Sequence, residues 1–295
     1  MKPSGCCFAI ILAMQNEMIE RDRPPNPAHD LNVRRAHNGD CTILVCSCDK
    51  YADVVGPFAK LYRKYWPDCP FETVLVTETD LGHSGFNRTI ACGGGLNWCE
   101  MLAMALCGIT TPYVIMLMND YYLTEPVNTS MVLSRLDQIK QFDAASLRLN
   151  PLPQGRLPWR DTDLLEMPKN VAYCVTCQVS IWNRDFLLGI AKRNKSAWEF
   201  ERYGSFEVGD EPRPLLVTPT KEFPFIDAVH KGYWEKFGVK CLADNGIAYD
   251  FSKRGLPPFK VRFVEGLKAF IFAVVPNNWI VRVQNAFDLG AKEKK

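Results

Sequence analysis

The sequence predicts a doubly wound α/β fold, in which helices flank a mixed, mostly parallel sheet. Short apolar runs typical of buried strands alternate with amphipathic helical patterns from residue 42 to residue 149. Each strand is followed by a helix and then by another strand, an order that places parallel strands side by side. The chain has 295 residues, of which 47% are hydrophobic and 23% charged, so it can bury a large core.

The first strand–helix–strand unit lies between residues 42 and 77. Thr42–Cys46 reads TILVC, an apolar run bounded by polar residues, and Phe71–Thr77 reads FETVLVT, which is rich in β-branched residues. Between them, Pro57 is expected in the first turn of a helix that Pro67 ends. The apolar residues on one face of this helix are Phe58, Leu61, Tyr62 and Tyr65.

A glycine-rich loop from Glu78 to Leu96 separates this unit from the next helix. Asn97 and Glu100 match a capping box at the start of a helix. The Asn97 side chain can accept from a free backbone N–H of the first turn, while the Glu100 side chain reaches back to the backbone N–H of Asn97. A strand at Val114–Met118, a helix and a strand at Asp143–Leu149 are expected to follow. The two helical faces consist of Trp98, Met101, Leu102, Ala105, Leu106 and Ile109, and of Val132, Leu133, Leu136 and Ile139.

Beyond Asn150 a proline-rich loop interrupts the alternation. We expect a strand over Ala172–Trp182, a helix starting near Asn183 and a short helix around Ser196–Tyr203. Residues 1–40 are polar and turn-rich, which predicts a poorly ordered leader. Residues 41–255 are expected to form one domain, and residues 256–295 a tail that packs on the domain or on a membrane surface.

Composition narrows the functional classes. A net charge of +2 and a pI near 7.9 argue against a dedicated nucleic-acid-binding protein. Several of the twelve cysteines lie in apolar stretches, so we expect mostly reduced thiols in a cytoplasmic chain. Cys46-x-Cys48 and Cys174-x-x-Cys177 match only half of a zinc pattern each.

The sequence contains no long apolar span. The N-terminal stretch CCFAIILAM has the length of a secretory core but is followed by the polar run QNEMIERDR. Residues 269–275 are too short to cross a bilayer, since about 18 to 20 apolar residues are needed. We predict a cytoplasmic location, with the inner face of the plasma membrane as an alternative through contact with this segment.

The stretch VIMLMNDYYL places Asn119 and Asp120 directly after a strand. In an open parallel sheet, ligands bind outside the carboxyl ends of the strands, where the strand order reverses. Asp49 follows the first strand in the same way. The alternatives are a turn at Asp120 and a cap of the next helix by Asp49.

Two further segments carry candidate residues. Ser196 and Glu199 match a capping box, which favours a structural Glu199. Glu201 points about 200° away from Glu199 around a helix and is the candidate general base. His230 follows a short apolar run, where a structural histidine competes with a metal or phosphate contact.

Several common motifs are absent from the sequence. It contains no GxxxxGK(S/T) and no GxGxxG pattern, which argues against a P-loop kinase and a nicotinamide dehydrogenase. It contains no GxSxG either, which argues against an α/β-hydrolase.

Five segments in this order resemble bacterial glycosyltransferases of the capsule and surface-polysaccharide type. The resemblance spans roughly residues 42 to 250. The segments are Ser47-Cys48-Asp49-Lys50-Tyr51, Lys64-Tyr65-Trp66-Pro67-Asp68-Cys69, Asn119-Asp120-Tyr121-Tyr122-Leu123, Ser180-Ile181-Trp182-Asn183-Arg184-Asp185-Phe186-Leu187 and Ser196-Ala197-Trp198-Glu199-Phe200-Glu201.

This resemblance implies the GT-A fold, a Rossmann-type half that holds a nucleotide and continues into an acceptor-binding C-terminal half. In that fold an acidic DxD-type motif holds the donor diphosphate through Mn²⁺ or Mg²⁺, because a divalent cation neutralises the leaving group. Asp120 matches the last acid of the motif, and Asn119 stands where an acid is common. An amide is a weaker ligand than a carboxylate, so whether the metal is required stays open.

The resemblance also implies roles for the other candidates. Asp49 would lie near the base or ribose of the donor, and Trp198 would contact substrate. Glu201 would deprotonate an acceptor hydroxyl, and His230 would complete the metal site with Asp120.

The sequence thus predicts a glycosyltransferase that moves a sugar from a nucleotide-sugar donor to a surface glycan, free or lipid-linked. One alternative is a transferase-like domain that only binds glycans, which Asn119 favours. The other is a nucleotidyltransferase, which would need a basic phosphate-gripping loop that is not evident near Asn87-Arg88.

Overall fold

The computed structural model describes residues 39–152 and 155–258. Their contacts form two compact units. Over the described residues, unit 1 contains residues 39–49, 66–118 and 127–223, and unit 2 contains residues 50–65, 119–126 and 224–258. The predicted leader and tail, including residues 269–275, lie almost wholly outside the described residues.

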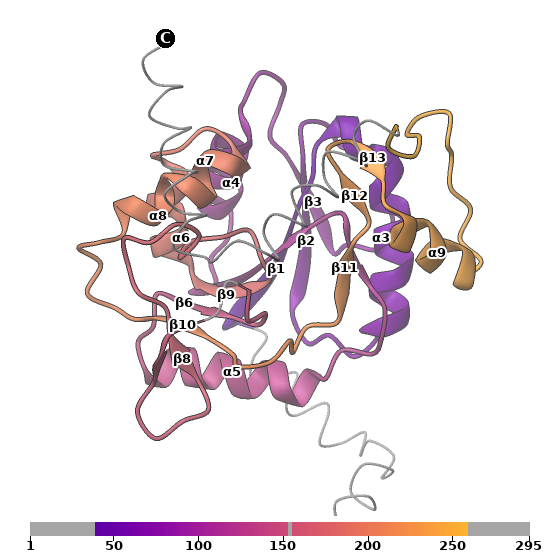
Figure 1. The fold of residues 1–295 in the computed structure, drawn as a ribbon. Coiled ribbons are helices and arrows are strands. Elements are labelled where there is room, and N and C mark those ends of the chain that lie inside the picture. Colours follow the sequence, from indigo (N-terminus) through magenta and orange to yellow (C-terminus); the bar gives the residue numbers. More distant parts are fainter. Residues whose placement is uncertain (1–38, 153–154, 259–295) are drawn as a thin grey trace, which may run out of the picture. The chain divides into compact units, whose positions relative to one another are not determined.

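Unit 1 is built on a nine-stranded sheet with the order β3-β2-β1-β4-β9-β6-β10-β8-β7 (Figure 1). The pairings β3-β2, β2-β1, β1-β4 and β6-β10 are parallel, whereas β9 and β8 are antiparallel to both of their neighbours. Seven strands therefore run in one direction, which confirms the mixed, mostly parallel sheet. The strands are β1 Cys41–Cys46, β2 Glu72–Thr77, β3 Arg88–Ala91, β4 Tyr113–Met118, β6 Ser146–Arg148, β7 Leu157–Pro158, β8 Leu165–Glu166, β9 Ser180–Asn183 and β10 Leu215–Val217.

Helices cover both faces of this sheet. Helices α4 (Trp98–Cys107) and α6 (Arg184–Ala191) pack against each other and against strand residues of one face, and α5 (Thr129–Gln141) contacts β6 and β9. Alternate strand residues share a face, so the core beneath α4 and α6 repeats with period two. Its members include Leu44, Cys46, Val74, Val76, Val114, Met116 and Trp182 from the strands and Met101, Leu102, Ala105, Leu106, Leu187 and Ile190 from the helices.

The predicted helix starts are confirmed. The Asn97 side chain accepts from the Glu100 N–H at 3.1 Å, and the Asn97 N–H donates to the Glu100 carboxylate at 2.8 Å. Asn183 caps α6 by accepting from Phe186 N–H at 3.1 Å. Short polar side chains thus supply acceptors for the free N–H groups of the first turn.

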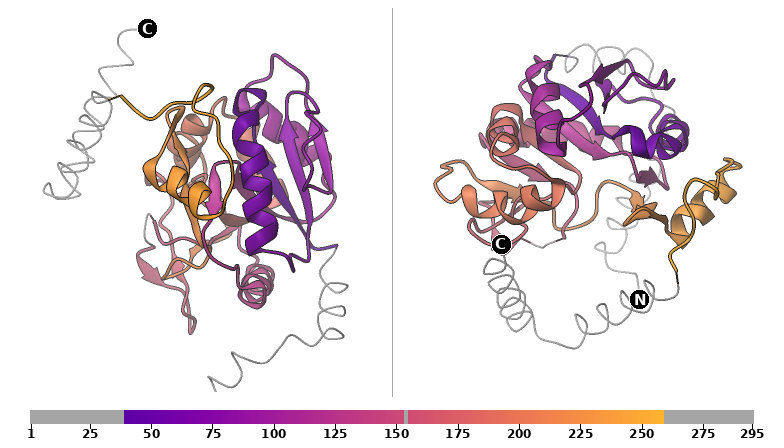
Figure 2. Two further views of the ribbon diagram at one scale, coloured as in Figure 1. Left: turned by 90° about the vertical axis from the view of Figure 1, so that its right-hand side faces the viewer. Right: turned by 90° about the horizontal axis from the view of Figure 1, so that it is seen from above.

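The structure differs from the prediction at several places. The predicted loop at Glu78–Leu96 contains strand β3, because residues 88–91 pair with β2, and the strand predicted over Asp143–Leu149 covers only Ser146–Arg148. Helix α3 (Ala52–Tyr65) begins before Pro57, which lies inside the helix instead of in its first turn and cannot donate to the carbonyl of Asp53. Figure 2 nevertheless shows α3 as one unbroken helix. Strand β9 begins only at Ser180, because residues 173–178 form a loop whose backbone groups bond to side chains of other elements.

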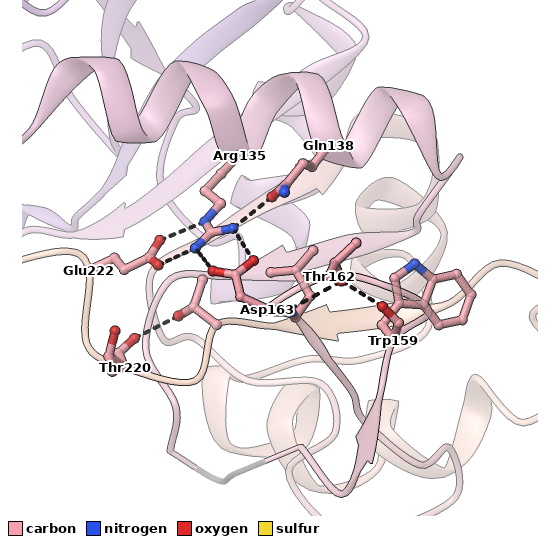
Figure 3. A network of polar contacts seen from close by, with 9 residues as sticks. Arg135, Gln138, Trp159, Thr162, Asp163, Thr220 and Glu222 are labelled. Atoms are coloured by element: carbon pink, nitrogen blue, oxygen red, sulfur yellow. Dashed lines mark hydrogen bonds and ion pairs between the residues drawn. The ribbon is translucent and has the colours of Figure 1, made fainter. Parts of the chain in front are cut away.

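A buried arginine fastens α5 to two connecting segments of unit 1 (Figure 3). The Arg135 guanidinium donates twice to the Glu222 carboxylate, at 2.8 and 2.5 Å, and twice to Asp163, at 2.9 and 2.6 Å. It also donates to the Gln138 amide oxygen at 2.8 Å. The bonds to Glu222, followed by those to Asp163, raise the pKa of Arg135 even though burial opposes its charge.

Unit 2 combines α3 with two small antiparallel ladders and a further helix. Strand β5 (Tyr121–Leu123) pairs with β11 (Phe225–Asp227), and β12 (Val229–His230) pairs with β13 (Tyr233–Trp234). Helix α9 (Lys236–Asp244) contacts β11, and α3 contacts β5. In the part of the chain that the structure describes, no helix has the length and apolar character needed to cross a membrane.

Candidate active site

The order of strands in unit 1 reverses between β1 and β4. From β1 the chain proceeds to β2 and β3 on one side, and β4 lies on the other side. The two parallel strands end together, since Cys46 pairs with Met118. In open α/β sheets this reversal marks the place where ligands bind, outside the carboxyl ends of the strands. Asp49 follows β1, and the chain leaves β4 directly into Asn119 and Asp120.

Asp49 joins the segments that follow β1 and β2. Its carboxylate accepts from the Thr79 hydroxyl at 2.6 Å and from the Thr79 N–H at 3.1 Å, and its own N–H donates to Glu78 at 2.5 Å. The hydroxyl bond is the first cause that lowers the pKa of Asp49 below its usual range. The bonds that the structure gives to this carboxylate thus run to Thr79, in the segment after β2.

Glu201 lies at the same edge of the sheet in unit 1. Strand β9 is antiparallel to β4, and Ser180 pairs with Met116, so the loop before Ser180 extends beyond the carboxyl end of β4. In this loop, the Thr176 hydroxyl and the Cys177 N–H each donate to Glu201 Oε1 at 2.8 Å. The fold thus brings two predicted carboxylates, Asp49 and Glu201, to one edge.

Glu201 has structural partners that the sequence interpretation did not foresee. It is half-buried on α7 (Ala197–Arg202) and anchors the loop before β9. Glu199 is structural, as predicted: its N–H donates to Ser196 at 3.1 Å, and its carboxylate accepts from the Lys195 N–H, one residue earlier than a capping box requires.

Trp198 lies on the same helix and is 52% exposed. The Tyr203 ring meets its ring edge-on at a centroid distance of 5.8 Å, and the Arg202 guanidinium lies 4.9 Å from its centre. Residues three apart on a helix are neighbours on its surface, so Trp198 and Glu201 share one side of α7. An exposed aromatic side chain beside a carboxylate suits a polar ring-shaped ligand.

Asn119 and Asp120 form a turn within unit 2, so the turn interpretation of Asp120 is confirmed as a description of the backbone. The Asp120 carbonyl accepts from Tyr122 N–H at 3.1 Å and from Ala228 N–H at 2.8 Å. Asn119 is 4% exposed, and its amide lies 3.5 Å from the Tyr51 carbonyl oxygen. The turn is therefore held by backbone atoms of Asp120.

The Asp120 carboxyl is half-buried and close to a second acid. Burial, followed by the charge of Asp227 on β11, raises the pKa of Asp120 to about 7, while Arg254 opposes the shift. Two nearby carboxylates disfavour each other's ionisation, and a divalent cation relieves that repulsion. Mg²⁺ is commonly held by one or two carboxylates together with substrate phosphates, so this pair fits such an ion.

Asp227 is the residue that sequence reasoning missed. It stands three residues before His230, and only the antiparallel pairing of β11 with β5, which aligns Asp227 with Tyr121, reveals its relation to Asp120. His230 itself is an exposed residue of β12. Within the described residues of either unit, no group of three or more His, Cys, Asp or Glu side chains lies close enough to hold a metal ion.

The cysteines and the cavities of unit 1 do not coincide with the candidate carboxylates. The ten cysteines in the described ranges are not in disulfides, and burial raises the pKa of Cys46 to about 12. Two cavities of unit 1, of about 410 and 540 Å³, contain none of the predicted site residues. The larger one is lined by Glu72, Asn87 and Thr111, near the amino ends of the strands, whereas the chemistry expected of this fold belongs to the carboxyl ends.

The structure defines an α/β protein in which Asp49 follows strand β1 and Asp120 follows strand β4 along the chain. No protein-family model and no curated protein matches the sequence. Solved structures that are similar include S. aureus TarS, residues 1–349, at 13% identity and a TM-score of 0.36, covering 61% of this chain and 60% of that one.

Two further similar structures are transferases by name. A cytidylyltransferase from Leptospira borgpetersenii is 9% identical at a TM-score of 0.40 and covers 70% of this chain and 95% of that one. A nucleotidyl transferase from Methanothermobacter is 11% identical at a TM-score of 0.40, with 61% and 87% covered. Similarities at this level define no activity for the chain.

Proposed function

We propose that this protein is a glycosyltransferase that moves a sugar from a nucleotide-sugar donor to a hydroxyl of a surface-glycan acceptor. The observation that carries the proposal is the half-buried Asp120 carboxyl, which follows β4 directly and shares its surroundings with Asp227. A carboxyl pair of this kind suits a phosphate ligand only together with a cation, as a nucleoside diphosphate would require.

The donor side of the reaction involves the residues after β1 and β4. Asp49, held ionised by Thr79, would accept hydrogen bonds from the ribose or the base of the donor. Asp120 and Asp227 would hold Mn²⁺ or Mg²⁺, with His230 as a further candidate ligand. A divalent ion there would neutralise the charge that develops on the leaving diphosphate.

The acceptor side involves α7. Glu201 would accept the proton of the attacking hydroxyl, so that the oxygen can form the new glycosidic bond while the bond to the diphosphate breaks. Trp198 would contact a sugar ring with its exposed face. The carboxylate oxygen that already accepts from Thr176 and Cys177 is fixed by those bonds, which leaves the other oxygen as the proton acceptor.

Nucleotidyl transfer is the second candidate, because a carboxylate pair that holds a phosphate-bound cation serves either reaction. A nucleotidyltransferase would need a basic loop that binds phosphate, and the residues near Asn87 and Arg88 do not supply one. Arg88 lies on β3, where it pairs with Glu72 at 2.7 Å and donates to the Gly108 carbonyl at 3.2 Å. The third possibility, a glycan-binding domain without activity, predicts no donor turnover at all.

Product analysis separates these functions. The purified protein is incubated with Mn²⁺ in two parallel reactions, one with a panel of UDP-, GDP- and CMP-linked sugars and one with nucleoside triphosphates and sugar phosphates, and the products are identified by mass spectrometry. Glycosyl transfer releases the nucleotide part of the donor, and the sugar is found either free in solution after reaction with water or bonded to the added glycan. Nucleotidyl transfer requires a nucleoside triphosphate with a sugar phosphate and releases pyrophosphate. Pyrophosphate release, or no turnover of any donor, contradicts the proposal.

A further inference from the structure

The loop before β9 is bonded at almost every residue. The buried Arg148 on β6 donates to the carbonyls of Tyr173 and Cys174, at 3.1 and 2.9 Å. The Ser205 hydroxyl accepts from Val175 N–H at 3.0 Å and donates to the Val175 carbonyl at 3.1 Å. A loop with so many of its backbone groups paired holds its side chains in fixed positions.

Thr176 is the residue of this loop that touches Glu201 through a side chain. It is 3% exposed, and its hydroxyl accepts from the Gln178 N–H at 3.2 Å. With that N–H directed at its oxygen, the hydroxyl proton is free to point at Glu201 Oε1, 2.8 Å away. The Cys177 N–H reaches the same oxygen. One carboxylate oxygen thus receives two hydrogen bonds.

We propose that Thr176 is a positioning residue for Glu201, whose hydroxyl fixes one carboxylate oxygen so that the other faces the acceptor. The proposal rests on the proposed function, since it needs Glu201 to accept a proton. The Arg148 guanidinium supports the arrangement, because it donates to the loop carbonyls and attracts the Glu201 charge. Rotation of the carboxylate would swing the reactive oxygen away from the acceptor hydroxyl.

The test compares Thr176→Val, which keeps the shape and removes the hydroxyl, with Thr176→Ser, which keeps the hydroxyl. Turnover is measured as nucleotide release from the sugar donor that the wild-type protein uses best, in the full chain with Mn²⁺. We expect Thr176→Val to lower kcat about 10- to 100-fold with KM unchanged, because misplacing a reacting group by about 1 Å has this effect. Thr176→Ser is expected to restore kcat to within about twofold of wild type, since its hydroxyl makes the same bond.

A double-mutant cycle isolates the positioning role. In the Glu201→Gln background, Thr176→Val should have no further effect on kcat, because the two side chains act as one unit. If Thr176→Val lowers only the melting temperature, or if its effect on kcat adds fully to that of Glu201→Gln, Thr176 is not a positioning residue.

The same set of variants distinguishes failure of the Thr176 proposal from failure of the proposed function. Wild-type turnover in Glu201→Gln would remove Glu201 from the reaction and leave the donor site intact. No turnover of any donor by the wild-type protein would overturn the proposed function and the role of Thr176 with it.

Discussion

The Asp120 carboxyl is in a setting that favours its neutral form. Burial and the Asp227 charge raise its pKa from 3.8 to about 7. The folded protein therefore binds this proton more tightly than the unfolded chain does. The stability that the proton contributes is fully present below about pH 4 and is lost as the pH rises through about 7. An isolated Asp at the end of a turn would show no such dependence.

The Asp120→Asn variant tests this electrostatic setting. Because Asn is neutral at every pH, we expect the variant to match the wild type near pH 4 and to exceed its free energy of unfolding at pH 8. The expected gain is a few kcal/mol, since each pKa unit corresponds to about 1.4 kcal/mol. Thermal unfolding across this pH range, without divalent cations, gives the answer. A constant difference between the two proteins at all pH values would show that Asp120 does not titrate in this range.

At the scale of elements, β1, β2, β4, β6 and the helices α3 to α7 could be predicted because their signals are local. Strand β3 and the short elements β5, β7, β8, β10 to β13, α8 and α9 were not predicted. The helix starts at Asn97 and Asn183 are predictable, because their capping hydrogen bonds join residues only three positions apart. The late start of β9 could not be predicted, since its cause is tertiary. Residues 173–178 are apolar enough for a strand, but Arg148 and Ser205 take the backbone groups that a ladder would use.

We expect the ion pairs of the buried Arg135 to contribute most among the polar contacts that hold α5 against the rest of unit 1. Arg135→Met leaves Glu222 without its partner, and breaking a buried pair costs about 3–5 kcal/mol. Arg88→Met is the matched control, because the Arg88–Glu72 pair has side chains that are 39% and 38% exposed and should cost less than about 1 kcal/mol. Urea unfolding of both variants measures the difference. Equal losses of stability would mean that the Arg135 contacts are no more important than a surface ion pair.

For the whole molecule, the sequence interpretation proposed its candidate residues from topology. Acidic residues after two apolar strands mark the carboxyl edge of a parallel sheet, and the pairing of Cys46 with Met118 confirms that these strands end together. Asp227 escaped prediction because nothing in its own segment distinguishes it from an ordinary strand residue. Its relation to Asp120 exists only through the pairing of β11 with β5. Thr176 escaped for the same reason, since its partner Glu201 lies on a later helix.

Calorimetric titration with a nucleoside diphosphate and Mn²⁺ tests the central claim, that Asp120 holds the phosphate end of a nucleotide donor. UDP, GDP and CDP are titrated into the wild-type protein, Asp120→Asn and Glu201→Gln. We expect the wild type and Glu201→Gln to bind one of them with similar affinity, because a base acts mainly in the transition state. Asp120→Asn should bind it at least about tenfold more weakly, which corresponds to about 1.4 kcal/mol. Equal affinity of Asp120→Asn and wild type, or no binding by the wild type, would contradict the account.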